Sequence, residues 1–245
     1  MSDLQHPDSR PFELVADVYE RARPEYPAAA IAWLAERLDL RAGRTVLDLG
    51  AGTGKLTRAL LPTGARVVAV EPGAQMLGQL RRVLPEVEAQ LGAAEAIPLA
   101  DASVDAITVG QAFHWFRHDE ALPEMRRVLR RHGAVCLIWN ARDRQWDVSK
   151  LLEDFIPSDR AAPGTWSDKL AASELFGAVE QRRFQFVQTL DADGLVDRIF
   201  SISFVAAAPE QKRAALERKL RALVAEHGGQ VELPYVTDVY VSYAA

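Results

Sequence analysis

The chain has 245 residues, of which 49% are hydrophobic and 26% charged, the composition of an ordinary soluble globular protein. Lys and Arg number 29 against 34 Asp and Glu, and this net charge of −5 argues against nucleic-acid binding, which requires a basic face. No stretch approaches the ~20 consecutive apolar residues of a membrane span, and the N-terminus MSDLQHPDSRPFELV lacks the pattern of a signal peptide. We therefore expect a cytoplasmic protein that binds neither nucleic acid nor membranes.

The chain is expected to bind no metal. Its single cysteine, Cys136, excludes an intrachain disulfide and a multi-cysteine zinc site. Cys136 lies in the apolar run AVCLIW, which predicts a buried, unreactive thiol. There is also no cluster of acidic residues and histidines that would suggest a metal-assisted enzyme.

The first 140 residues alternate short β-branched runs with longer helical patterns, which predicts a doubly wound α/β fold. The continuous apolar character of the runs is typical of parallel strands covered on both faces. Strands are predicted at residues 44–49, 66–70, 87–91, 104–109 and 134–139, and helices at 55–61, 74–84 and 119–131.

The pattern changes after residue 139. Residues 141–180 mix charges, prolines and tryptophans without periodicity, and we interpret them as an inserted lid or acceptor-side segment over the carboxyl edge of the sheet. A strand near 183–190 and helices near 191–205 and 209–227 follow, with Pro209 in a first turn. The alternating tail 230–244 predicts a last strand, at or near a sheet edge because it contains Pro234.

A glycine-rich turn follows the first predicted strand in the segment VLDLGAGTGKLT (46–57). Glycines at alternate positions allow a ligand to approach the backbone without a Cβ in the way. The start of the next helix supplies unpaired N–H groups and a partial positive charge. The segment therefore predicts a ligand-binding loop.

The residues around this loop restrict the kind of ligand. The P-loop spacing is absent, and Lys55 occupies the place of the third glycine of a dinucleotide fingerprint. Asp48 would repel a phosphate but attract an ammonium group. Glu71, at the end of the second predicted strand, is placed to accept hydrogen bonds from ribose hydroxyls. The two carboxylates indicate a ligand with a ribose and a cationic amine and without phosphate, which describes S-adenosyl-L-methionine.

Several segments in the same order resemble class I S-adenosylmethionine-dependent methyltransferases. VLDLGAGTGKLTRAL and VVAVEPGAQML resemble the first two motifs of the class, and GAAEAIPLADASVDAITVGQAFHWF and LPEMRRVLRRHGAVCLIWNARD resemble the later ones. YERARPEYP (19–27) and PYVTDVYVSYA (234–244) are similar to the small-molecule methyltransferases of the trans-aconitate and ubiquinone-biosynthesis type. The resemblance implies a Rossmann-like, mostly parallel seven-stranded sheet with an N-terminal helical cap. It also implies one methyltransferase domain over 1–245, with a donor-binding core at 12–142 and a C-terminal part at 181–245 that completes the sheet.

The resemblance also assigns residues to the methyl donor, with S-adenosyl-L-homocysteine as the product. Asp48 would face the methionine ammonium and Glu71 the ribose. The acidic residue that contacts adenine in many relatives is replaced here by Ala93, so that the backbone of Ala94 or the Glu95 carboxylate is expected to substitute for it. The remaining expected donor contacts are Tyr19, Arg23, Gly50, Ala51, Gly52, Gly54, Pro72, Met76, Gln111 and Ala112.

The acceptor side is expected at the ends of the fourth and fifth predicted strands. His114 is the candidate general base, since an imidazole titrates near pH 6.5. The alternative is that His114 only binds the acceptor or shapes the site. Trp115, Trp139 and Asn140 would line an aromatic wall with a polar anchor, and Arg142 would pair with an acceptor carboxylate or form a surface ion pair.

The sequence thus predicts methyl transfer to a small organic acceptor by in-line displacement. Oxygen, as carboxylate or hydroxyl, is the expected acceptor atom, followed by carbon. Two alternatives stay open from the residues alone: an oxidoreductase that uses a nicotinamide dinucleotide, and a non-catalytic protein that binds S-adenosylmethionine. The acceptor itself and the choice between monomer and homodimer are not encoded in any recognisable motif.

Overall fold

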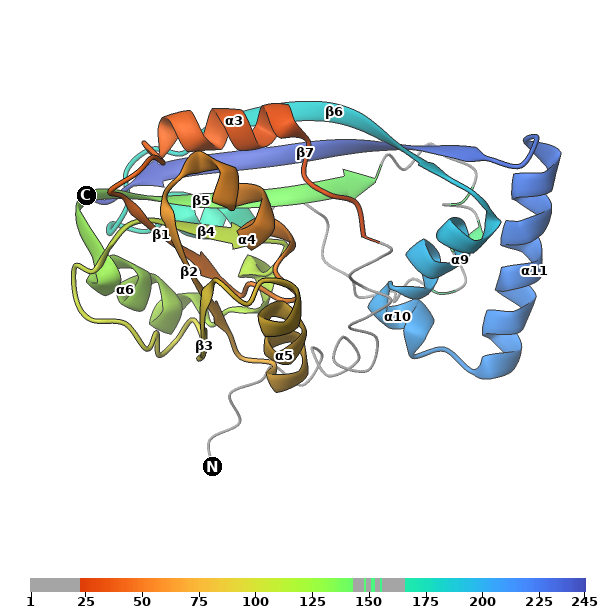
Figure 1. Cartoon of the computed structure of the whole chain (residues 1–245), viewed down its shortest axis with the longest axis horizontal. Helices are drawn as coiled ribbons and strands as arrows, with labels where there is room; N and C mark the ends of the chain where they lie inside the picture. The colour runs from red at the N-terminus through yellow and green to blue at the C-terminus, as the bar shows by residue number, and fades with distance from the viewer. Residues whose placement is uncertain (1–22, 143–147, 149–150, 153–154, 156–165) are drawn as a thin grey trace.

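The computed structural model describes residues 23–142, 148, 151–152, 155 and 166–245. Its centre is a seven-stranded sheet with the order β3-β2-β1-β4-β5-β7-β6, in which β7 runs antiparallel to both of its neighbours and the other pairings are parallel (Figure 1). This topology confirms the predicted doubly wound, mostly parallel sheet. The strands are β1 (Thr45–Leu49), β2 (Arg66–Glu71), β3 (Glu88–Leu91), β4 (Val104–Gly110), β5 (Leu129–Arg142), β6 (Glu180–Leu190) and β7 (Val231–Tyr243).

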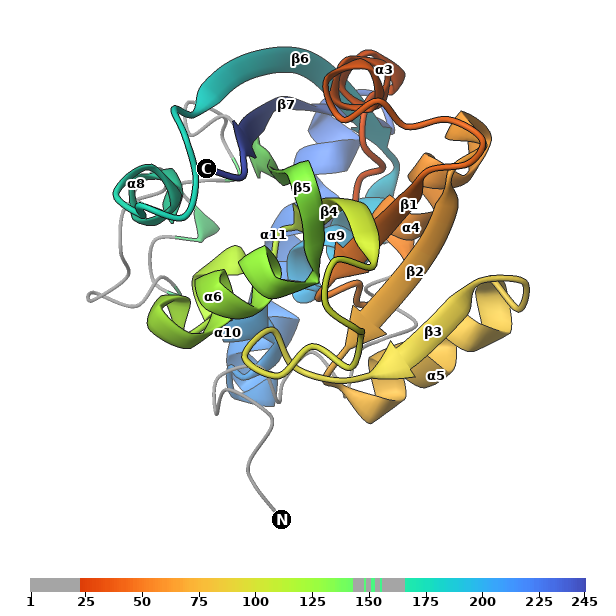
Figure 2. The same ribbon diagram turned by 90° about the vertical axis from the view of Figure 1, so that its left-hand side faces the viewer.

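Helices cover both faces of the parallel part of the sheet, because successive strand residues point to opposite sides. Leu47 and Ile107 pack with residues of α6 on one face, and Val46 and Ala106 pack with α3 and α4 on the other (Figure 2). The elements that connect the parallel strands or precede them are α3 (Ala28–Arg37), α4 (Lys55–Leu60), η2 (Leu61–Thr63), α5 (Ala74–Val83), η3 (Phe113–Trp115) and α6 (His118–Val128).

The boundary between α6 and β5 differs from the prediction of a helix over 119–131. The helix ends at Val128 and the strand begins at Leu129, which pairs with Val104 before the register shifts to Ala106 opposite Ala134. A left-handed backbone at His132 (φ 63°) accompanies this irregularity. The charged run that resembles a helix end therefore belongs to an irregular start of β5.

The last strand lies next to the sheet edge, and β6 forms the edge itself. The pairing of β7 with β5 ends at Tyr235, so Pro234 lies where β7 pairs with β6 alone, opposite Val187. A proline is tolerated there because only one neighbouring strand requires hydrogen bonds from the segment.

The far ends of β6 and β7 carry a separate group of helices beyond the carboxyl edge of the parallel strands (Figure 1). The predicted helix at 191–205 is two helices, and Asp191 caps the first by accepting a hydrogen bond from the Gly194 N–H. A hydrophobic cluster joins these helices to the distal part of β7 and includes Val148 and Leu152 from the predicted lid. The remaining helices are α8 (Trp166–Ala171), α9 (Ala192–Phe200), α10 (Ser203–Ala206) and α11 (Glu210–Glu226). Within the described ranges, none of the helices has the length and apolar character needed to cross a membrane.

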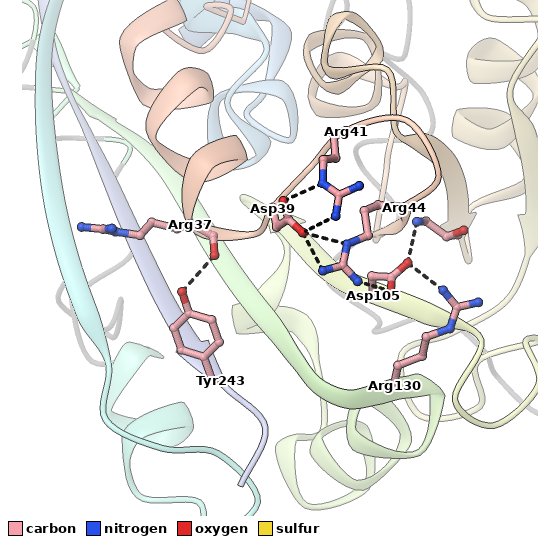
Figure 3. Close-up of polar contacts among 8 residues, drawn as sticks. Arg37, Asp39, Arg41, Arg44, Asp105, Arg130 and Tyr243 are labelled. Carbon is pink, nitrogen blue, oxygen red and sulfur yellow. Dashed lines mark hydrogen bonds and ion pairs between the residues drawn. The ribbon is translucent and has the colours of Figure 1, made fainter.

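An ion-pair network closes the amino-terminal edge of the sheet (Figure 3). The Asp105 carboxylate accepts hydrogen bonds from Arg44 Nη1 (3.0 Å), Arg130 Nη1 (2.7 Å) and the Thr45 backbone N–H (2.8 Å). Burial alone would raise the pKa of Asp105. The contacts with Thr45 and the arginines together outweigh this effect, so the pKa lies below its usual value. The network thereby fixes the starts of β1, β4 and β5 relative to one another.

Asp105→Ala is expected to lower the free energy of unfolding by about 1–3 kcal/mol, because it leaves a strand N–H and two arginines without their shared acceptor. The contribution of Asp105 is present at neutral pH and is lost as the pH falls through its depressed folded-state pKa. Urea denaturation at pH 7 measures the change. Asp101→Asn is the control, since Asp101 pairs with Arg127 but is 78% exposed, and an equal loss in both variants would contradict the role of Asp105.

Candidate active site

The glycine loop between β1 and α4 has an unusual backbone. Gly50, Gly52 and Gly54 all have positive φ values, of 70°, 58° and 92°. L-residues with a Cβ adopt this region at a cost of roughly 1–2 kcal/mol each, which explains the glycines at alternate positions. The loop turns the chain sharply from the end of a buried strand into the first turn of α4.

The three glycines meet different surroundings. A Cβ at Gly50 would lie 2.8 Å from the Ala112 Cβ, and one at Gly54 would lie 3.0 Å from Leu80 Cγ in α5. A Cβ at Gly52 would meet nothing within 4 Å. Gly50 and Gly54 therefore serve close packing within the protein, whereas Gly52 borders open space that a ligand could fill.

Asp48 is fully buried at the end of β1. Its Oδ2 accepts a hydrogen bond from Thr57 Oγ1 of α4 (2.6 Å), and its Oδ1 lies 3.4 Å from Thr108 Oγ1 of β4. Desolvation raises the pKa of Asp48 to about 6, although the hydrogen bonds from the two threonines oppose the shift. The carboxylate is thus held in a fixed position and is ionised at neutral pH, where it can attract a cation.

Glu71 lies at the end of β2 and is 8% exposed. Its Oε2 accepts a hydrogen bond from the Gly52 N–H (2.8 Å) and its Oε1 accepts one from the Gly73 N–H (2.8 Å). The carboxylate is therefore oriented by the backbone of both loops, at the β1–β2 side of the crevice where an α/β sheet binds its ligand.

A pocket opens at the carboxyl edge of β1 and β4, between the glycine loop, the segment before α3 and α9. Several predicted residues contribute to it, namely Arg23, Asp48, Gly50, Ala51, Gly52, Gln111 and Asn140. The rest of the lining consists of Pro24, Tyr26, Thr53, Lys55, Leu56, Gly110 and Arg198.

The segment before α3 lies over the ends of β4 and β5. Asn140 Nδ2 donates to the backbone oxygen of Glu25 (3.2 Å), and its Oδ1 accepts a hydrogen bond from Thr237 Oγ1 (2.7 Å). A Cβ at Gly110 would lie 2.7 Å from the Tyr26 hydroxyl, so this glycine permits the close approach of the segment. Gln111 follows β4, has a left-handed backbone (φ 59°) and lines the pocket.

The predicted aromatic wall lies beside the pocket lining rather than in it. The His114 and Trp115 rings contact each other in η3, with centroids 4.5 Å apart. Trp139 is 8% exposed and packs edge-on to Tyr240. Arg142 is the last residue of β5 and pairs with Tyr235.

The other predicted donor contacts lie around the ends of β2 and β3. Pro72 follows β2, Met76 is buried in α5, and Ala94 is 4% exposed. Glu95 Oε1 accepts a hydrogen bond from the Arg117 backbone N–H (2.7 Å), which gives that carboxylate a structural contact at the start of α6. Tyr19 lies outside the described residues.

Arg198 and the threonine partners of Asp48 were not predicted. Arg198 is 3% exposed and lies in α9 among the buried Leu195 and Ile199. An arginine at helical spacing among apolar residues is a detectable signal, because charged side chains are rarely buried without a function or a partner. Thr57 and Thr108 gave no such signal. Thr108 lies beside Asp48 through the register of β1 and β4, and Thr57 through the turn of the glycine loop into α4.

Comparisons with known proteins identify the family to which the chain belongs. The methyltransferase domain model of the Methyltransf_11 family matches residues 47–137. An uncharacterised methyltransferase of Mycobacterium tuberculosis is 41% identical over 231 residues, which cover 92% of each chain, and one of Schizosaccharomyces pombe is 33% identical over 239 residues, covering 93% of this chain and 94% of that one.

The fold is also similar to a solved structure from Anaeromyxobacter dehalogenans, provisionally named a type II methyltransferase. The TM-score is 0.68 with 24% sequence identity, over 89% of this chain and 97% of that one. The chain belongs to the class I S-adenosylmethionine-dependent methyltransferases, as the two sequence relatives and the domain match show. It is therefore an enzyme of the methyltransferase class, and the two alternatives left open by the sequence are set aside.

The raised pKa of Asp48 predicts a pH-dependent stability. Because burial raises the folded-state pKa of Asp48 to about 6, above the value of about 3.9 for a free aspartate, the folded state binds more protons than the unfolded state between these pH values. Stability therefore falls as the pH rises through this window. Relative to Asp48→Asn, the wild type is expected to lose about 2–3 kcal/mol of unfolding free energy between about pH 4 and pH 7.

Urea denaturation at both pH values tests this difference. Asp193→Asn is the matched control, because Asp193 is 84% exposed. If the difference in unfolding free energy between the wild type and Asp48→Asn does not change with pH, the pKa of Asp48 is not raised in the folded state.

Two alanine substitutions should separate the roles of the glycines. Gly54→Ala is expected to cost about 2–4 kcal/mol of stability, from left-handed strain and overpacking against α5. Gly52→Ala should cost only the strain, roughly 1–2 kcal/mol, but should weaken S-adenosylhomocysteine binding at least about tenfold, since its Cβ points into ligand space. Thermal unfolding and calorimetric titration measure the two effects.

Gly228→Ala is the control, because Gly228 has a similar φ of 75° and an open Cβ position but lies at the end of α11. An S-adenosylhomocysteine affinity that Gly52→Ala leaves unchanged would contradict the placement of the donor beside Gly52.

Proposed function

We propose that the protein transfers the methyl group of S-adenosylmethionine to an oxygen atom of a small organic acceptor. The proposal is carried by one observation: the glycine loop with Asp48 lines the same pocket as Asn140 and as Arg198 of α9. Residues of the glycine loop and residues of β5 and α9 thus border one space at the carboxyl edge of the sheet.

The residues at the donor side fit S-adenosylmethionine. Asp48 would hold the methionine ammonium and Glu71 the ribose hydroxyls, while the backbone at Gly52 leaves room for the ligand. When bound, the donor supplies an electrophilic methyl group on a sulfonium. The remaining predicted contacts, from Ala94 and Met76 to Gln111, would surround the adenine and the methionine chain.

The protein would contribute mainly position and exclusion of water. Alignment of two bound reactants can supply roughly 7–11 kcal/mol of the barrier in favourable intramolecular models. The segment with Tyr26, held over β4 and β5 by Asn140, would shield the reacting atoms from solvent.

An oxygen acceptor in the form of a carboxylate suits the lining. A carboxylate needs no general base, because it carries no proton at neutral pH. Among the described lining residues no histidine occurs, and Arg23 and Arg198 are cationic. His114, in η3 beside the pocket, would act as a base only for a hydroxyl acceptor, and otherwise shapes the site with Trp115 and Trp139.

The test combines donor binding with product analysis. S-Adenosylmethionine and S-adenosylhomocysteine, but not NAD or NADP, should raise the melting temperature by several degrees at about 100 times Kd. Glu71→Gln should weaken this binding at least about tenfold, whereas Glu86→Gln, in an exposed turn, should not.

Acceptors are then identified by transfer of labelled methyl groups to a mixed panel of acids, alcohols, phenols and amines. A methyl ester releases methanol on mild alkali, and a methyl ether can be recognised by mass spectrometry. Methylated products at nitrogen or carbon alone would refute the oxygen assignment, and donor binding would then still stand.

A further inference from the structure

The first residue of α4 carries a charge that its position does not favour. Lys55 lies directly after the three glycines of the loop, lines the pocket and has a side chain that is only 11% exposed. The unpaired N–H groups of a first helical turn already bear partial positive charge, so a cation is disfavoured there. A lysine that is held mostly out of water at this place therefore needs an anionic partner.

The partner comes from a distant part of the chain. Lys55 Nζ donates a hydrogen bond to Glu25 Oε1 (2.8 Å), and Arg58 Nη1, one turn along α4, lies 3.5 Å from the same oxygen. Within the part of the chain that the structure describes, Glu25 is the one carboxylate that pairs with Lys55. The ion pair thus joins the end of the glycine loop to residues 23–27, which precede α3 and which we call the strap.

The strap forms part of the pocket wall. Pro24 and Tyr26 line the pocket, whereas Glu25 between them has a side chain that is 57% exposed and reaches to α4. Asn140, at the end of β5, donates from Nδ2 to the backbone oxygens of Pro24 (3.4 Å) and Glu25 (3.2 Å). The strap is therefore tied to the sheet by Asn140 and to the glycine loop by Lys55.

The two ties of the strap differ in kind. Asn140 makes neutral hydrogen bonds, and its Oδ1 accepts a hydrogen bond from Thr237 Oγ1 of β7 (2.7 Å), so this tie is anchored in the sheet. The tie through Lys55 is an ion pair with a partly exposed carboxylate, and such a pair is weakened by dissolved salt. The contact between the strap and the glycine loop therefore depends on charge, whereas the contact with β5 does not.

We infer that Lys55 is a positioning residue, which holds the strap beside the glycine loop through Glu25 and thereby slows the dissociation of the methyl donor and of its product. The inference rests on the proposed function, in which the donor lies against the glycine loop in the pocket that the strap borders. A wall that is held in place before binding loses less conformational freedom when the ligand arrives. Because most changes of affinity within one site act on release, loss of the ion pair should raise the dissociation rate.

The experiment uses the full chain with S-adenosylhomocysteine as the probe. Its dissociation rate is measured by surface plasmon resonance for the wild type, Glu25→Gln, Lys55→Met and the double variant. We expect each single variant to release the probe about three- to tenfold faster. The double variant should release it no faster than the single variants, because all three lack the same ion pair. Effects that multiply in the double variant would contradict the inference.

The dependence on ionic strength distinguishes the ion pair from a general effect on the fold. Between about 0.05 and 0.5 M sodium chloride, the dissociation rate of the wild type should rise toward that of Glu25→Gln, whose own rate should change less. Glu36→Gln is the matched control, because Glu36 is 76% exposed on α3 and lies 4.0 Å from Arg37; it should behave as the wild type. The same salt dependence in the wild type and in Glu25→Gln would refute the inference.

The outcomes separate this inference from the proposed donor site. Failure of the wild type to bind S-adenosylhomocysteine would refute the donor site. Faster release from Lys55→Met but not from Glu25→Gln would show that the lysine contacts the ligand directly, and the inference alone would fail. If Lys55→Met does not fold, the exchanged pair Glu25→Lys with Lys55→Glu replaces it. The exchanged pair should release the probe more slowly than Glu25→Lys alone, and a rate that is not slowed would overturn the inference.

Discussion

The organisation of the site depends on the buried carboxylate of Asp48. Its contacts with Thr57 and Thr108 join the end of β1 to α4, at the far end of the glycine loop, and to the neighbouring strand β4. A carboxylate without solvent is costly, and its raised pKa is the sign of that cost. Buried groups with a shifted pKa are often found at functional sites, and Asp48 lies beside the pocket. Burial and the two threonine contacts thus hold the Asp48 carboxylate in one position in the lining of the pocket.

The rest of the fold holds in place the two parts of the chain that border the pocket, the glycine loop and α9. Hydrophobic clusters on both faces of the parallel strands hold the glycine loop, while a separate cluster holds α9 and α11 at the far end of β6 and β7. The strand β7 is common to both parts, because it pairs with β5 over Tyr235–Tyr243 and continues with β6 alone to Val231. At the opposite edge of the sheet, the Asp105 network fixes the strand starts, so the register of the site is determined from both ends.

Much of this arrangement could be predicted from the sequence, because it is local. Apolar runs identify buried parallel strands, and glycines at alternate positions identify the loop and the carboxylates beside it. What could not be predicted depends on long-range pairing or on an ambiguous local pattern. The run after Val128 is rich in arginine and resembles a helix end, but its pairing with Val104 makes it strand. Thr108 lies beside Asp48 only through the register of β1 and β4. The apolar spacing around Arg198 could have indicated its burial in a helix, but not its place in the pocket, which depends on how α9 packs at the end of β6 and β7.

The separation of the hydrophobic clusters has a consequence for how such an enzyme can diversify. Among the residues that the structure describes, none of the cluster around α9 and α11 belongs to the clusters that support the glycine loop. Distant sites that share no packing neighbours respond to substitution almost independently. The α9–α11 group can therefore be remodelled, in nature or by recombination between relatives, while the half that holds the loop keeps its stability. Substitutions that change the α9–α11 group would then leave the packing around the glycine loop intact.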